Sequence, residues 1–130
     1  MPDSPITVLK RLADRWNAHD LDAVYGLMHP DYREYLNGAL IKQGAVAARA
    51  ADQPIYETVP DYRREVDELY ADDKGGAIRW RFLGTGPNGL FEVPLASTYR
   101  IDGGKIVEAW IYGDPMALAR ALGLAVEGAA

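Results

Sequence analysis

The sequence contains no cysteine, so disulfides, thiolate nucleophiles and cysteine-based zinc sites are all excluded. Acidic residues outnumber basic ones, with 19 Asp and Glu against 14 Lys and Arg, so the formal net charge is −5. That balance argues against a nucleic-acid-binding surface, which needs clustered Lys and Arg. No apolar run approaches the roughly 20 residues of a membrane-spanning helix, and the N-terminus lacks the basic and apolar regions of a signal peptide. We therefore expect a cytoplasmic protein without a nucleic-acid or membrane partner.

The composition is otherwise that of a globular protein. The chain has 130 residues, of which 48% are hydrophobic and 25% are charged. This length suits one domain with a substantial core, and we assign residues 1–130 to it. The last residues, 124–130, are expected to form a loose tail.

Helical signals dominate the first part of the chain. Ser4 and Pro5 mark a helix start, and Ile6, Leu9, Leu12, Ala13 and Trp16 follow at helical spacing. Asp20 can cap a second, short helix that Pro30 stops. The Ala-rich segment from Leu40 to Tyr56 predicts a third helix.

Strand signals dominate the second part. The runs that predict strands are Tyr32–Leu36, Arg64–Ala71, Ala77–Leu83, Leu90–Ile101 and Lys105–Tyr112. Turns rich in Gly, Asp and Asn separate them, and residues 115–122 predict a terminal helix that ends at Gly123. This order predicts an α+β fold with helices on one side of an antiparallel sheet.

The last strand is largely apolar on both faces. By period 2, one face carries Ile106, Glu108, Trp110, Tyr112 and Asp114, and the other carries Val107, Ala109, Ile111 and Gly113. Such a strand needs cover on both sides. Helices can cover one side, and a second copy of the sheet could cover the other, so we predict a homodimer through the sheet face.

The strand at residues 77–83 leaves two interpretations open. If Arg79 and Arg81 face a pocket, one of them could pair with Asp114, stabilise an enolate or hold a water between two acids. If Trp80 faces inward, the arginines lie on the outer face and in the dimer interface. The pattern favours the second interpretation, because Ile78, Trp80 and Phe82 together are typical of a core face.

Several motifs together resemble the SnoaL-like polyketide cyclase branch of the nuclear transport factor 2-like superfamily. The resemblance runs from Leu9 to Gly123, and its motifs are residues 16–22 (WNAHDLD), 29–32 (HPDY), 102–110 (DGGKIVEAW), Asp114 and residues 118–123. It implies a cone: a curved antiparallel sheet of about four to six strands around three N-terminal helices, with a short C-terminal helix and a hydrophobic cavity.

The resemblance also implies chemistry. Members of this branch cyclise polyketide esters by intramolecular aldol condensation without metal or organic cofactor, and the Asp that matches Asp114 is their acid/base. Ketosteroid isomerases and limonene-type epoxide hydrolases share the shape. This chain departs from the pattern at its short turn, residues 84–89, and at Tyr35, where a His is common.

The candidate catalytic residues are Asp114, Tyr35 and His29. A desolvated Asp114 could move a proton, although Asp114 before Pro115 is also a good helix cap. Tyr35 and Tyr32 lie on opposite faces of their strand, and the inward phenol could donate to an enolate. His29 is a candidate base, or a helix-end residue that satisfies carbonyl groups.

The candidate substrate-binding residues are aromatic, and each could equally be ordinary core: Trp16, Tyr32, Trp80, Phe91, Trp110 and Tyr112. Three functions remain open. The first is a cofactor-independent cyclase or isomerase that acts on an apolar, polyketide-like carbonyl compound. The second is an epoxide hydrolase, and the third is a module that binds a small ligand or dimerises without catalysis.

Overall fold

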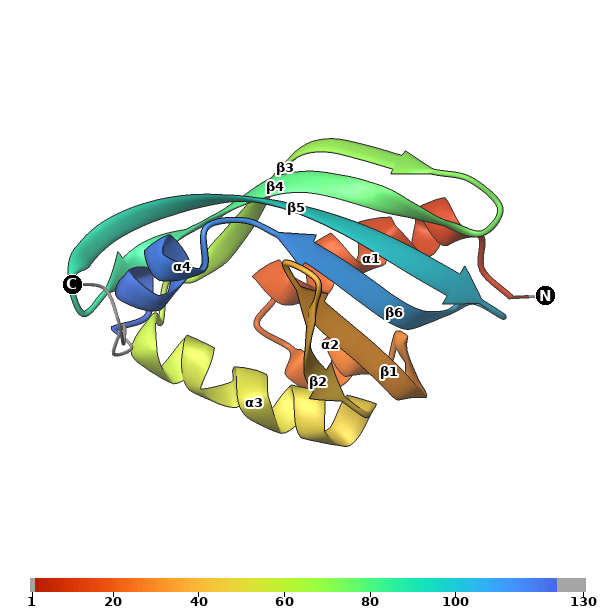
Figure 1. The fold of residues 1–130 in the computed structure, drawn as a ribbon, viewed down its shortest axis with the longest axis horizontal. Coiled ribbons are helices and arrows are strands. Elements are labelled where there is room, and N and C mark those ends of the chain that lie inside the picture. The colour runs from red at the N-terminus through yellow and green to blue at the C-terminus, as the bar shows by residue number, and fades with distance from the viewer. Residues whose placement is uncertain (1, 124–130) are drawn as a thin grey trace.

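The computed structural model describes residues 2–123, so the predicted tail at 124–130 lies outside the described residues. Its centre is a strongly curved six-stranded sheet with helices along its concave side (Figure 1). The helices are α1 (Pro5–Asn17), α2 (Leu21–Tyr25), α3 (Ala45–Thr58) and α4 (Pro115–Ala121). The strands are β1 (Met28–Leu36), β2 (Ala39–Gln43), β3 (Arg63–Ala71), β4 (Gly75–Gly86), β5 (Gly89–Asp102) and β6 (Lys105–Tyr112). The predicted α+β class, with three N-terminal helices and a short C-terminal one, is confirmed.

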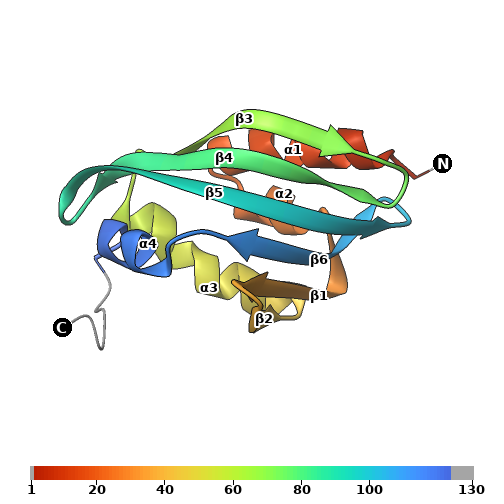
Figure 2. The same cartoon turned by 45° about the horizontal axis from the view of Figure 1, so that its top comes forward.

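The strand order is β2-β1-β6-β5-β4-β3, and every neighbouring pair is antiparallel except β1 with β6. The expectation of a wholly antiparallel sheet is therefore wrong at this one pair. The parallel contact joins the first strand of the chain to the last, so β1 and β2 extend one edge of the open sheet. Figure 2 shows α1, α2 and α3 behind the sheet, with α4 beyond the end of β6.

The predicted third helix starts too early, because residues 39–43 form a strand. Asn37 and Gly38 both adopt positive φ, at 49° and 90°, and they close a tight hairpin. The chain therefore returns alongside β1 as β2 before α3 begins at Ala45. This hairpin places Lys42 directly opposite Glu34.

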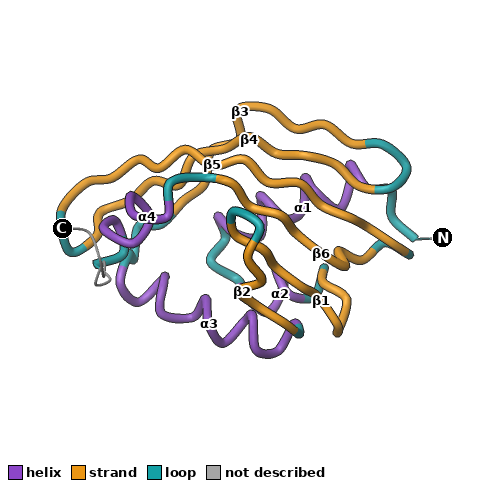
Figure 3. The backbone as a smooth tube through the Cα atoms, viewed as in Figure 1, coloured by secondary structure: helices purple, strands orange, loops and turns teal. Residues whose placement is uncertain are grey.

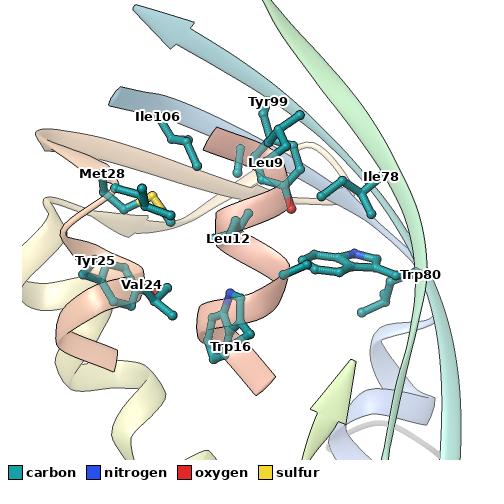
Figure 4. Packing of buried hydrophobic residues seen from close by; sticks show 14 of the residues in the cluster. Leu9, Leu12, Trp16, Val24, Tyr25, Met28, Ile78, Trp80, Tyr99 and Ile106 are labelled. Atoms are coloured by element: carbon teal, nitrogen blue, oxygen red, sulfur yellow. The ribbon is translucent and has the colours of Figure 1, made fainter. Parts of the chain in front are cut away.

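The concave face of the sheet forms the core with α1. Ile78 and Trp80 of β4 point toward α1, where Leu12 and Trp16 lie (Figure 4), and Phe82 of the same strand is also buried. Because Trp80 points inward, its neighbours Arg79 and Arg81 point outward, as the favoured interpretation predicted. Hydrogen bonds join Arg81 to carboxylates on both flanking strands: Glu65 and Asp67 of β3, and Glu92 of β5.

Strand β6 does not keep the strict alternation expected of it. Arg100 pairs with Glu108 while the next residue, Ile101, pairs with Ile106, so one extra β6 residue forms a bulge. Ile106 is therefore fully buried on the concave side, whereas Trp110 lies on the convex side, and their assignment to one face is wrong.

One end of the concave space is closed by helices. Figures 2 and 3 both show α4 beside the C-terminal end of α3. Leu118 and Leu122 at α4, and Ile55 of α3, line the same cavity. The fold therefore encloses a space between the concave face, α1 and these two helices.

Candidate functional site

A cavity of about 350 Å³ lies between the concave sheet face and the helices. Its walls are mostly aliphatic and aromatic, as is typical of small-molecule sites. Four charged side chains are part of these walls: Glu34, Lys42, Asp52 and Arg64. Charged groups in an apolar wall are costly unless they are paired, so their partners indicate what the cavity can do.

Local structure explains how three of these groups converge. Alternation along β1 turns Tyr32 and Glu34 inward, and the hairpin register brings Lys42 beside Glu34. In α3, Ala48 and Asp52 are four residues apart, so they lie on the same buried face. Asp52 is only 3% exposed and Glu34 only 7%.

These side chains form one connected acid network: Tyr25, Tyr32, Glu34, Lys42 and Asp52. The Lys42 ammonium donates to Asp52 Oδ1 at 2.5 Å and lies 3.0 Å from Glu34 Oε2. The Tyr32 hydroxyl donates to Glu34 Oε1 at 2.7 Å, and the Tyr25 hydroxyl donates to Asp52 Oδ2. Each carboxylate therefore accepts from a phenol and contacts the same ammonium.

Burial and charge fix the protonation of the donors. Burial alone disfavours the charged ammonium, but the carboxylates of Glu34 and Asp52 outweigh it and raise the pKa of Lys42. Burial raises the pKa of Tyr25 and of Tyr32 well above the ordinary value, and the adjacent carboxylates raise both further. At neutral pH the network thus contains a charged ammonium and two neutral phenols, all of them proton donors.

A second charged wall lies at the other edge of the sheet. The Arg64 guanidinium of β3 lies 3.7 Å from the ring centre of Trp16 and 4.0 Å from that of Phe82. Its Nε donates to the Tyr62 hydroxyl at 3.0 Å. Burial raises the pKa of Tyr62 to about 12, against the opposing charge of Arg64.

Two of the residues predicted from the sequence line the cavity, namely Trp16 and Tyr32. Trp80 is buried and its indole donates to the Ser97 hydroxyl at 3.2 Å, but it is not a lining residue. Tyr32 points inward and Tyr35 outward, which agrees with their predicted opposite faces.

The other predicted residues lie elsewhere. The exposed Asp114 carboxylate accepts from the backbone N–H groups of Met116 and Ala117, so it caps α4. His29 accepts from the backbone N–H of Asp31. The remaining residues are outside the cavity lining: Tyr35 and Trp110, which stack at 3.9 Å on the convex face, exposed Tyr112, and Phe91 near the β4–β5 turn. Their proposed functional roles stay predictions.

Four cavity residues were not predicted from the sequence: Glu34, Lys42, Asp52 and Arg64. One of them carried a readable signal, because Glu34 shares the face of Tyr32 by strand parity. The position of Lys42 beside Glu34 could not be predicted, because it depends on strand β2, which was itself not predicted. Asp52 lies in a helix of small residues, where no strong apolar stripe marks the buried face.

Within residues 2–123, no group of three or more His, Asp or Glu side chains is placed to hold a metal ion. None of the helices in the same range is long and apolar enough to cross a membrane.

The tyrosines of the acid network predict how stability depends on pH. Tyr25 releases its proton near pH 10 when unfolded but much higher when folded, so above about pH 10 the folded state holds more protons than the unfolded state. The free energy of unfolding should therefore fall as pH rises from about 9.5 to 11. In Tyr25→Phe this fall should be shallower, by up to about 1.4 kcal/mol per pH unit, as measured by urea denaturation.

The matched control is Tyr112→Phe, which removes an exposed hydroxyl on the convex face. Its pH dependence should follow that of the unmodified protein. If Tyr25→Phe and the unmodified protein lose stability with the same slope, the buried neutral phenol is not a feature of the folded protein.

Comparison with solved structures supports the fold. IdmH, a proposed polyketide cyclase from Streptomyces antibioticus, is 22% identical, with a TM-score of 0.77 over 94% of this chain and 100% of that one. A proposed SnoaL-like polyketide cyclase from Jannaschia sp. CCS1 is 20% identical, with a TM-score of 0.75 over 97% and 99%. A protein with a ketosteroid isomerase-like fold from Catenulispora acidiphila, in complex with trimethylamine, is 17% identical, with a TM-score of 0.76 over 95% and 96%.

A comparison with curated proteins found no match. The sequence pattern of one family, SnoaL-like polyketide cyclase, matches residues 6–122. That match spans α1 to α4, and so includes every residue of the acid network and Arg64. The resemblance indicated by the motifs is confirmed, and the chain belongs to the SnoaL-like polyketide cyclase family.

Proposed function

We propose that the protein is a proton-transfer enzyme that cyclises or isomerises a small, polyketide-like carbonyl compound in its apolar cavity. Asp52 is the proposed acid/base. The observation that carries this proposal is the position of Asp52: a carboxylate only 3% exposed, on the cavity wall, held by an ammonium and a phenol. The chain also belongs to a family described as polyketide cyclases, which supports a small-molecule substrate.

The first step is removal of a proton from a carbon next to a carbonyl group. Each carboxylate oxygen of Asp52 accepts one hydrogen bond and keeps a further lone pair, so it can accept that proton. The apolar walls exclude water, which strengthens the interaction of the developing enolate with nearby donors. Lys42 supplies such a donor, because its ammonium has three N–H groups and contacts only two carboxylates.

The second step differs between the two reactions. In an intramolecular aldol cyclisation, the enolate carbon attacks a second carbonyl, a C–C bond forms, and the new alkoxide takes up the proton. In an isomerisation, the same proton returns to another carbon. Both products are isomers of the substrate, so neither reaction requires an oxidant or a reductant.

The test uses a panel of polyketide-like and polycyclic ketones in D₂O. Exchange of α-hydrogen for deuterium is followed by NMR, and product formation by mass spectrometry. Asp52→Asn should lower the exchange rate about 100-fold or more, the usual range for loss of a general base. Asp114→Asn, which alters the exposed α4 cap, should retain most of the rate.

The two variants therefore test whether Asp52 or Asp114 is the acid/base. A larger loss in Asp114→Asn than in Asp52→Asn would contradict the assignment to Asp52, and would support the role that the family resemblance implies for Asp114. Binding of ketones without exchange or product in the unmodified protein would favour a non-catalytic ligand-binding module.

A second candidate function rests on Lys42, which lies between two acids. Such an arrangement could hold a water for epoxide hydrolysis. One carboxylate takes a proton from the water, the hydroxide attacks an epoxide carbon, and the C–O bond at that carbon breaks. The alkoxide that this leaves takes up the proton from the carboxyl group, which gives a diol. Incorporation of ¹⁸O from labelled water into the product of an epoxide panel would select this function over cyclisation.

We also propose that the protein forms a homodimer through the convex sheet face. Tyr35 and Trp110 stack there with 5° between their planes, and Tyr112 beside them is 47% exposed. No described helix covers this face, as Figure 2 shows. Partly exposed aromatic patches of this type support association between protein surfaces.

Sedimentation velocity tests the dimer. Trp110→Lys places a charge in the aromatic patch and should convert the dimer to a monomer. Leu90→Lys introduces the same side chain at an 88% exposed position at the start of β5 and should leave the dimer intact. A monomeric unmodified protein at micromolar concentration would contradict the proposal.

A further inference from the structure

We propose that Arg64 is the receptor for a carboxylate group on the ligand. The inference rests on the proposed function only in assuming that the cavity holds an organic ligand. It narrows the ligand class to small apolar carbonyl compounds that also carry a carboxylate.

The position of Arg64 is fixed by its backbone. Asn17, at the end of α1, accepts from the Arg64 backbone N–H at 2.7 Å and donates to its carbonyl oxygen at 2.8 Å. Arg64 pairs with Phe82 across β3 and β4, so its side chain lies on the concave side. A residue held at both backbone groups and in the sheet register presents its guanidinium at a defined place in the cavity wall.

The guanidinium faces are covered by aromatic rings. Its central carbon lies 3.7 Å from the ring centre of Trp16, 4.0 Å from that of Phe82 and 4.5 Å from that of Trp80. Trp16 and Trp80 approach it from α1 and β4, two elements that lie against each other in Figure 4. Stacking stabilises the charge but leaves the edge of the planar group available for hydrogen bonds.

That edge is largely unused. Nε donates to the Tyr62 hydroxyl, but the terminal nitrogens have no acceptor and no carboxylate partner among residues 2–123. The outward arginines of the sheet differ: Arg33 contacts Glu108 at 2.8 Å and Arg81 contacts Asp67 at 2.9 Å. An arginine on the inner wall without such a partner can pair with a ligand carboxylate through two parallel hydrogen bonds.

The acid network explains why the anion would bind at Arg64 rather than at Lys42. Lys42 is already shared by Glu34 and Asp52, so a third carboxylate there would be repelled. Arg64 lies on β3, at the opposite edge of the sheet from β1 and β2. A ligand held at Arg64 by its carboxylate can therefore extend through the apolar middle of the cavity toward Asp52.

The experiment compares carboxylates with neutral amides of the same shape. Benzoate, trans-cinnamate and 2-naphthoate are titrated by calorimetry against benzamide, trans-cinnamamide and 2-naphthamide. The unmodified protein should bind at least one carboxylate about tenfold or more tightly than its amide, as expected for a charge-assisted bidentate pair. Equal affinity within every pair, including no binding of any probe, would overturn the proposal.

Arg64→Met keeps an unbranched apolar chain among the aromatic rings and should abolish the preference for the carboxylate. Arg63→Met is the matched control, because Arg63 is exposed on the same strand and its charge contacts Glu65 at 3.6 Å. It should keep the preference. An Arg64→Met protein that still prefers the carboxylate would overturn the proposal.

A second measurement does not depend on the folding of Arg64→Met. The terminal Nη–H resonances of Arg64, assigned by their loss in Arg64→Lys, should shift when the preferred carboxylate is added to the unmodified protein and not when the amide is added. Unmoved Nη–H resonances would contradict direct contact.

Failure of this inference is distinguishable from failure of the proposed function. Asp52→Asn should keep the carboxylate preference, because Asp52 does not contact Arg64. If the preference exists but no ketone exchanges protons, Arg64 binds carboxylates and the proposed enzyme activity is wrong. If ketones exchange protons but no carboxylate is preferred, only the inference about Arg64 is wrong, and the proposed function stands.

Discussion

The interaction on which the cavity depends is the contact of one ammonium, that of Lys42, with two buried carboxylates. Moving a carboxylate from water into a protein interior costs several kcal/mol, and removing one partner of a buried pair typically costs about 3–5 kcal/mol. Glu34 and Asp52 come from β1 and α3, and Lys42 reaches both from β2. The same contact therefore holds the helix against the sheet edge and keeps acidic groups in an otherwise apolar wall.

The hairpin between β1 and β2 makes that contact possible. Two residues with positive φ, Asn37 and Gly38, turn the chain so that Lys42 lies opposite Glu34. Helix α3 begins immediately afterwards, and its second turn brings Asp52 over the ammonium. A short turn on the surface thus determines the electrostatics of the interior.

Most of the fold could be predicted from the sequence because its signals are local. The alternation at residues 77–83 placed Trp80 inward correctly, and the run from Lys105 to Tyr112 gave the bounds of β6. The parallel pairing of β1 with β6 could not be predicted, because it joins segments that are far apart in the sequence. Strand β2 follows β1 directly, but its residues from Leu40 on were assigned to the Ala-rich helix that comes after them. The site was found only in part, because parity placed Tyr32 and Tyr35 on opposite faces without showing which of them points inward, and no local pattern shows that Asp52 and Lys42 meet.

The two charged walls make the two ends of the cavity electrostatically different. At the β1 edge, two carboxylates share a single ammonium, and at the β3 edge the Arg64 guanidinium has aromatic faces but no described carboxylate. Between them the lining is mainly apolar, so the field between the walls is screened far less than in water. An anionic group on a ligand is attracted to Arg64 and repelled by the acid network, whereas a neutral carbonyl group accepts a hydrogen bond at either wall. The charge arrangement therefore orients a ligand that carries both groups, with its carbonyl end at Asp52, where a proton can leave carbon and Lys42 can stabilise the enolate.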